Sequence, residues 1–278
     1  SRGLIAICAA LACMLSVSVR AEVGDTGPAS LALRSQMLRL AEIDWRLRVA
    51  ARSLCTEQAP GHGLWVDHSL AYINADRGML FRTLRLNQLP QVAAVATGSP
   101  ADRAGIRTGD EVELIAGLSM SDALANSVDP SLFADEVMDL LASSAMGHPI
   151  KLTLRRGKMS LSKTLETTPI CAGRTFLDFT PSLEAHTDNR DLAVSSALVA
   201  FTANDDELAF IVGHELAHGV LRSQLFEMRG DLTALEFEAD ALGSIIALCA
   251  GYDMQRAADL WKRIERQGAL AQARLMTH

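Results

Sequence analysis

The chain has 278 residues, of which 49% are hydrophobic and 21% are charged, a balance typical of a globular protein of two modest domains. Its formal net charge is −7, and no basic run is interleaved with aromatic residues, which argues against nucleic acid as its main partner. A chain of this length and composition can bury an ample hydrophobic core.

The first predicted element is an apolar segment at the N-terminus. Residues 3–19 carry no charge, Arg2 precedes them, and small residues surround Ala21, a pattern typical of a secretory signal peptide. We therefore expect residues 1–21 to be a signal peptide cleaved after Ala21, and the protein to be exported to the bacterial periplasm. One alternative is that the segment stays as a short membrane anchor. A weaker alternative is a lipoprotein-type site at Cys13.

The next segment, residues 22–56, is predicted to contain a long amphipathic helix over residues 29–54. It is expected to pack on the C-terminal domain through an apolar face and to turn a row of arginines to solvent. The apolar contacts are Leu33, Met37, Leu40, Trp45 and Leu47, and the arginines are Arg34, Arg39, Arg46, Arg48 and Arg52.

Short strands and turns are predicted over residues 62–168. A strand at residues 91–96 is followed by a glycine-rich segment, then by a helix at residues 131–143 and a strand at residues 150–155. The pieces Ser-Pro-Ala, Ala-Gly-Ile and Gly-Asp-Glu at residues 99–111 resemble a PDZ domain of the bacterial protease type. That resemblance implies a small β-sandwich or barrel that captures an extended peptide as an extra strand.

The sequence departs from the PDZ pattern just before Val92. Residues 86–90 contain no glycine-rich loop of the kind that holds a terminal carboxylate. Three roles therefore stay open, which are binding a C-terminus, binding an internal segment, and gating an active site without a ligand. His62, His68 and His148 lack the spacing of metal ligands and are expected to be surface or turn residues.

The cysteines agree with export. Cys8 and Cys13 would leave with the signal peptide, whereas Cys55 and Cys171 lie just outside the two ends of the middle domain. We expect a disulfide between Cys55 and Cys171 that ties those ends together, with three unpaired cysteines as the alternative. Cys249 lies in an apolar run and is expected to be a buried free thiol.

A His-Glu-x-x-His motif at residues 214–218 lies in a predicted helix over residues 206–221. Residues four apart share one face of a helix, so His214 and His218 can turn a ring nitrogen toward one point, as a zinc site requires. Glu215 lies to one side, where it can take a proton from water rather than bind the metal. The alternative is an amphipathic helix with two incidental histidines.

A second predicted helix, over residues 231–250 and closed by Gly251, provides the missing ligand. Glu236 and Asp240 share one face of it, and Glu238 points away. We assign Glu236 as the third zinc ligand, and expect Asp240 to hold one ligand histidine by its other ring nitrogen. A solvated acidic face is the alternative.

The pairing of the first motif with Glu-Phe-Glu-Ala-Asp-Ala-Leu-Gly at residues 236–243 resembles the HtpX and CAAX-prenyl-endopeptidase type of gluzincin, metallopeptidase family forty-eight. The resemblance runs from about residue 175 to the C-terminus. It implies a zinc-dependent endopeptidase with one zinc per chain, the ligands His214, His218 and Glu236, and Glu215 as the catalytic base. Integral-membrane members carry spanning helices around the site, and this chain has none there, so it resembles the soluble, exported branch.

The resemblance also implies roles for the flanking segments. The strand at residues 192–195 is expected to line the cleft, with substrate extended along it. Asp253 is expected to cap a last helix that reaches about residue 275, with Trp261 and Ile264 in the core. Tyr252, His186 and an arginine are candidates for stabilising the oxyanion, and His278 is a weak candidate for a fourth ligand. Relatives continue beyond this C-terminus.

The sequence as a whole predicts an α+β protein. A mainly helical zincin-type peptidase domain covers residues 172–278, and the PDZ-like domain is inserted after the N-terminal helix. Its expected partners are polypeptide substrates and a peptide ligand of the PDZ-like domain, with contact to a membrane only if residues 1–21 are retained. Two alternatives are a PDZ-based binding or chaperone-like factor with a structural zinc, and a zinc hydrolase of non-peptide substrates.

Overall fold

The computed structural model describes residues 27–188, 190–224 and 232–266, which fold into a mixed α+β protein as predicted. The predicted signal peptide and His278 lie outside these residues. In chain order the elements are α1 (Gly27–Ala51), β1 (Gln58–Gly61), β2 (Leu64–Asp67), η1 (Ser69–Ala71), α2 (Asn74–Leu84), β3 (Gln91–Val95), α3 (Pro100–Arg103), β4 (Glu111–Ile115), β5 (Leu118–Ser119), α4 (Met120–Ala125), η2 (Pro130–Leu132), α5 (Phe133–Ala142), β6 (Ile150–Arg156), β7 (Met159–Leu165), β8 (Thr168–Cys171), β9 (Thr175–Asp178), β10 (Ala185–Asp188), β11 (Asp191–Ser195), α6 (Ser196–Phe201), α7 (Asp205–Gln224), α8 (Leu232–Cys249), α9 (Met254–Ala257) and α10 (Asp259–Arg266).

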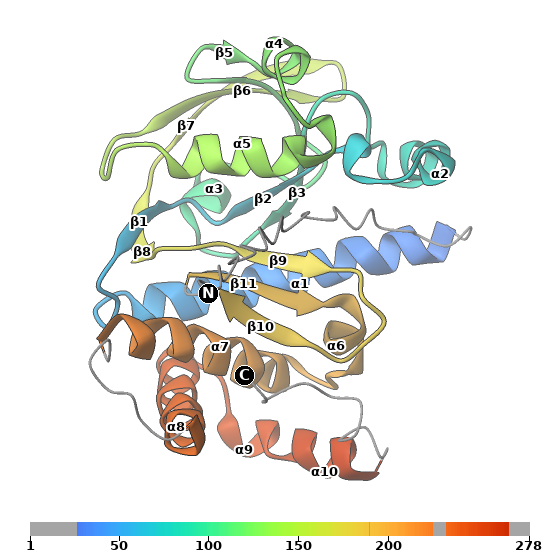
Figure 1. Ribbon diagram of the computed structural model, residues 1–278. Helices are drawn as coiled ribbons and strands as arrows, with labels where there is room; N and C mark the ends of the chain where they lie inside the picture. The colour runs from blue at the N-terminus through green and yellow to red at the C-terminus, as the bar shows by residue number, and fades with distance from the viewer. Residues whose placement is uncertain (1–26, 189, 225–231, 267–278) are drawn as a thin grey trace, which may run out of the picture.

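The first of two lobes, here called the sheet lobe, contains β2 to β7 with helices α2 to α5 (Figure 1). Its strands follow the order β2-β3-β4-β6-β7, with β5 beside β4, and each neighbouring pair is antiparallel. Helix α5 packs on this sheet with Phe133, Val137 and Leu141 buried. The predicted strand at residues 91–96, helix at 131–143 and strand at 150–155 are thus confirmed as β3, α5 and β6.

The edge of the sheet lobe differs from the prediction. The PDZ pattern places the peptide-holding loop before Val92, but Val92 lies in β3, which has β2 on one side and β4 on the other. A strand with two neighbours has no free backbone groups for a peptide. The edge strand beside α5 is β2, and the loop before it contains Gly63 with a φ of +72°.

Two further features of this lobe were missed. Helix α2 lies where the sequence predicts strands and turns, because it lacks a side-chain cap at Ile73 and has Gly78 in its middle. His62 and His68 lie in connecting segments, as predicted, but they are not at the surface, since they are only 6% and 1% exposed. Burial lowers the pKa of His62 to about 4, and its Nδ1 accepts a hydrogen bond from the Leu64 N–H.

Helix α1 lies between the sheet lobe and the second lobe, here called the helical lobe, which comprises β9 to β11 and α6 to α10 (Figure 1). Leu40, Ile43 and Leu47 of α1 are fully buried in the core of the helical lobe. Arg34 and Arg48 were expected to face solvent, but each is buried and paired inside the protein. The Arg34 Nη2 lies 3.2 Å from Asp67, and the Arg48 Nε lies 2.6 Å from Asp44.

In the helical lobe, α7 packs against α8 and against a three-stranded sheet of order β10-β11-β9. The predicted last helix is broken at Ala258 into α9 and α10, with Ile264 buried as expected, and residues 267–278 lie outside the described part. Cys249 is exposed rather than buried, because it lies on the outer face of the last turn of α8. Among the described residues no helix is both long and apolar enough to cross a membrane.

The predicted disulfide between Cys55 and Cys171 is present, with the two Cα atoms 5.6 Å apart. It lies beside the two-stranded ribbon of β1 and β8, where the chain enters and leaves the sheet lobe. The bond therefore joins the ends of a segment of 116 residues.

We expect loss of this disulfide to destabilise the protein by about 4 kcal/mol, because a cross-link over so long a segment restricts the unfolded chain strongly. The change is the double substitution Cys55→Ala and Cys171→Ala, and the measurement is urea denaturation. Cys249→Ala is the matched control, since its thiol is free and exposed. An unchanged urea midpoint in the double variant would contradict the expectation.

Candidate active site

Helix α7 begins with a capping box formed by Asn204 and Glu207. The Glu207 N–H donates to the Asn204 Oδ1 at 3.0 Å, and the Glu207 carboxylate accepts from the Ala203 N–H at 2.7 Å. The Arg263 guanidinium also pairs with Glu207, which is fully buried. These contacts hold the first turn of α7 in place and so fix the direction in which its later turns point.

Helices α7 and α8 approach each other backbone to backbone, and two glycines that the sequence analysis did not single out make this approach feasible. A Cβ on Gly213 would lie 2.9 Å from the Gly243 carbonyl oxygen, and one on Gly243 would lie 2.6 Å from the His214 amide nitrogen. Real Cβ atoms do not come that close. The crossing places the turns of α8 before Gly243, which carry Glu236 and Asp240, opposite His214 and His218.

His214, His218 and Glu236 converge on one point, as predicted. One side-chain atom from each lies within 4.8 Å of the others. The two Nε2 atoms are 3.0 Å apart, and the Glu236 oxygens lie 3.4 Å from the His214 Nε2 and 3.6 Å from the His218 Nε2. Both histidines are 1% exposed, whereas the Glu236 side chain is 22% exposed, so the cluster is reached from solvent on the Glu236 side.

Asp240 lies where the sequence predicted it. Its Oδ1 is 2.9 Å from the His214 Nδ1 and accepts a hydrogen bond from the N–H at that position, which leaves the Nε2 lone pair facing the cluster. Burial disfavours a charged His214, but this hydrogen bond and the charges of Glu215, Asp240 and Glu236 outweigh it and raise the pKa of His214. Glu238 is exposed on another face of α8, also as predicted.

The chemistry of this donor set fits a metal ion. Two imidazole nitrogens and a carboxylate oxygen turned toward one point repel one another unless a cation lies between them. Nitrogen and carboxylate ligands from two helices, with a carboxylate behind one histidine, are the ligand types that zinc takes in catalytic sites. Three protein ligands leave one coordination position open.

Glu215 lies beside the cluster without joining it. Its side chain is almost fully buried, and its Oε2 has no hydrogen-bond partner among the described residues. Burial raises the pKa of Glu215 to about 7, with Glu236 raising it further and His214 and Arg222 opposing the shift. A carboxylate with a pKa near neutrality is suited to accepting and returning a proton.

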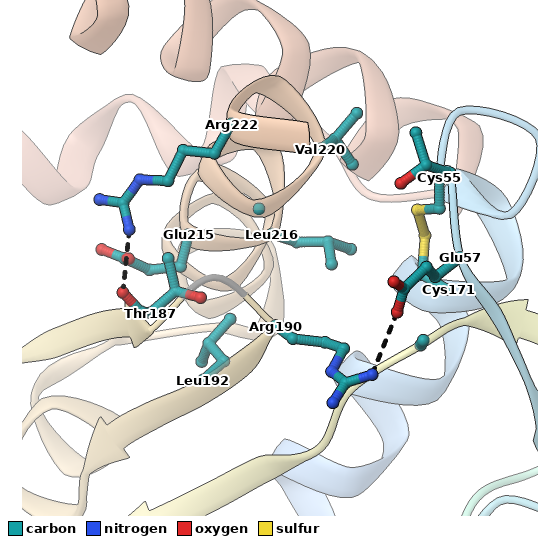
Figure 2. A pocket seen from close by; sticks show the side chains of 13 residues that line it. Cys55, Glu57, Cys171, Thr187, Arg190, Leu192, Glu215, Leu216, Val220 and Arg222 are labelled. Carbon is teal, nitrogen blue, oxygen red and sulfur yellow. Dashed lines mark hydrogen bonds and ion pairs between the residues drawn. A yellow bond between two sulfur atoms is a disulfide. The ribbon is translucent and has the colours of Figure 1, made fainter. Parts of the chain in front are cut away.

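A cavity of about 510 Å³ opens next to Glu215, and Figure 2 shows the side chains around it. One wall is α7, through Glu215, Leu216, Gly219, Val220 and Arg222. The opposite wall comprises Thr187 and Leu192 of the small sheet, with Arg190 between them in the chain, and the disulfide segments at Cys55 and Cys171 close the end. The candidate catalytic carboxylate therefore faces a space large enough for substrate side chains.

The predicted cleft strand needs correction. Residues 192–195 form β11, which has β10 on one side and β9 on the other, so its backbone is fully paired. The free edge near α7 is β10. The Leu192 N–H donates to the Arg174 carbonyl and so points away from β10, which makes Leu192 and its partner Thr187 a pair without hydrogen bonds to each other. The Thr187 carbonyl therefore points to the open side of β10. The Arg222 Nη1 lies 3.5 Å from that carbonyl, which agrees with this orientation.

Two of the three oxyanion candidates lie elsewhere. Tyr252 is buried against Arg46 of α1, and the next residue, Asp253, bonds through its N–H to Asp206 in the first turn of α7. His186 is exposed and alternates with Thr187 along β10, so its side chain lies on the other face of that strand. Of the arginines, Arg222 lies in the cavity wall with Glu215.

Residues 177–235 match the model of peptidase family M48. The matched segment contains the His-Glu-x-x-His motif and ends one residue before Glu236, so the M48 match supports a metallopeptidase that acts on polypeptides. A search of curated proteins finds no match.

A comparison of structures finds an HtrA-type protease, AlgW with a decapeptide, at 20% identity and a TM-score of 0.30. The likeness covers 40% of this chain and 30% of that protein's chain, so this chain spans less than a third of the length of that protein. A TM-score of this size does not establish a common fold.

Proposed function

We propose that the protein is a zinc-dependent endopeptidase of the HtpX and CAAX-prenyl-endopeptidase type, in which His214, His218 and Glu236 hold one zinc. The observation that carries the proposal is the convergence of these three side chains within 4.8 Å, beside a buried Glu215 that opens into a cavity of about 510 Å³. The family match over residues 177–235 supports it independently.

In this proposal, the residues divide the work of peptide hydrolysis. A bound zinc would polarise water and the scissile carbonyl. Glu215 takes the proton from the attacking water and passes it to the leaving amine, which its pKa of about 7 favours. Asp240 keeps the His214 ring in the orientation that turns its Nε2 inward. The open edge of β10 offers backbone groups to an extended substrate.

The sheet lobe would recruit substrate as a PDZ-like domain. The edge strand β2 and helix α5 border an apolar cavity of about 240 Å³, whose far side is formed by α1 and β9. A peptide that pairs with the β2 backbone could place an apolar side chain in this cavity. Residues 1–21 would direct the protein to the periplasm, or anchor it to the membrane if they are retained.

The proposal predicts that removal of metal abolishes hydrolysis. Purified protein should contain about one zinc per chain and degrade casein, an unfolded substrate. Dialysis against a chelator should remove both the zinc and the activity, and stoichiometric zinc should restore both. Zinc binding without hydrolysis of casein or a peptide library would instead favour a binding module with a structural metal. Activity that persists after complete zinc removal would contradict the proposal.

A further inference from the structure

We propose that Arg222 makes the cavity beside Glu215 selective for an acidic substrate side chain. This inference rests on the proposed endopeptidase function, and it adds a substrate preference to it. In this arrangement, Arg222 pairs with an Asp or Glu of the substrate while the substrate backbone lies along β10. Arg222 is thus a specificity residue that takes no part in proton transfer.

The position of Arg222 on α7 supports this role. It lies seven residues, about two helical turns, after Glu215, so both side chains belong to the same face of the helix. Gly219 lies between them in the same wall and has no side chain to fill the space. Figure 2 shows Arg222 reaching from α7 across the opening toward Thr187 on β10.

Among the residues that the structure describes, the guanidinium of Arg222 has few hydrogen-bond partners. Its only hydrogen bond to a described residue is the one to the Thr187 carbonyl, at 3.5 Å, which is the limit for such a bond. No carboxylate of the described residues forms an ion pair with it. A guanidinium has five N–H donors, so the described residues engage only a small part of its hydrogen-bonding capacity.

The other arginine of the cavity is engaged differently. The Arg190 Nη1 lies 3.0 Å from the Glu57 carboxylate, and both side chains are largely exposed. Arg190 therefore has a partner of its own in Glu57, whereas Arg222 forms no ion pair with a described carboxylate and acts on Glu215 only through its longer-range charge. Leu192, Leu216, Val220 and the disulfide contribute apolar groups to the cavity walls, alongside polar groups such as Thr187 and Glu57.

The test measures binding separately from hydrolysis. Peptides that differ only in one residue near the cleavage point, Glu, Gln or Lys, are titrated by fluorescence anisotropy into the Glu215→Gln variant, which should not cleave them. We expect the Glu peptide to bind about tenfold more tightly than the Gln peptide, as a charge-assisted hydrogen bond predicts, and the Lys peptide to bind most weakly. The Arg222 substitutions are made in the Glu215→Gln protein. There, Arg222→Gln should make the affinities for the Glu and Gln peptides equal, and Arg222→Lys should keep part of the preference for the Glu peptide. Arg222→Glu should bind the Lys peptide most tightly.

Arg190→Gln is the matched control, because it removes an arginine of the same cavity that is already paired with Glu57. The tighter binding of the Glu peptide should persist in this variant. Equal binding of the Glu and Gln peptides with Arg222 present would overturn the inference. So would a preference that survives Arg222→Gln or disappears in Arg190→Gln. These outcomes leave the proposed function standing, since that depends on hydrolysis by the wild-type protein.

Discussion

Substitution of Glu215 by Gln is expected to lower the rate of casein hydrolysis by roughly 10³-fold, the size of effect that loss of a general base produces. The amide has the shape of the carboxylate but cannot accept a proton from water at neutral pH. Because Glu215 lies outside the His214, His218 and Glu236 cluster, the zinc content should stay at about one per chain. The measurements are initial rates with casein and metal analysis of the same preparations.

Glu238→Gln is the matched control for this substitution. It makes the same chemical change on an exposed face of α8, close to the site in sequence, and should leave both rate and zinc content unaltered. The Glu215→Gln protein should be at least as stable as the wild type, because its buried Oε2 has no hydrogen-bond partner to lose among the described residues. Full hydrolytic activity in Glu215→Gln would rule out the assigned base.

The parts of the site that local spacing determines were predictable. The His-Glu-x-x-His motif, the capping pair Asn204 and Glu207, and the shared face of Glu236 and Asp240 all follow from helical periodicity, and the structure has each of them. The close crossing that joins the two helices depends on Gly213 and Gly243. Each is an isolated glycine within a helical pattern, which is itself a sequence signal for close packing, so this contact could have been found.

The errors have a different origin, which is pairing between segments that are distant in sequence. The open strand of the cleft is β10 rather than β11, because β9 pairs with β11 from the other side, and strands of four or five residues carry too little pattern to reveal their order. Arg34 and Arg48 look like solvent-facing charges on a helix. They are buried only because Asp67, Asp44 and Thr175 meet them inside.

Loss of Glu236 should remove the metal itself, which separates its role from that of Glu215. We expect Glu236→Ala to weaken zinc binding by more than about 100-fold, since loss of a group that only supports a ligand already costs 10–100-fold. Competition with a chromophoric chelator measures this, and the stabilisation of the protein by added zinc should disappear as well. Casein hydrolysis should fall to background.

Two neighbours on α8 complete a graded series with Glu236. Asp240→Ala removes the acceptor 2.9 Å from the His214 Nδ1, so zinc should bind about 10–100-fold more weakly but at the same stoichiometry. Glu238→Ala should bind zinc like the wild type, because its side chain is exposed and outside the cluster. Wild-type zinc affinity in Glu236→Ala together with loss of zinc binding in Glu238→Ala would show that a different face of α8 meets His214 and His218. The order of the three affinities therefore tests the packing of α8 on α7 as directly as it tests the ligands.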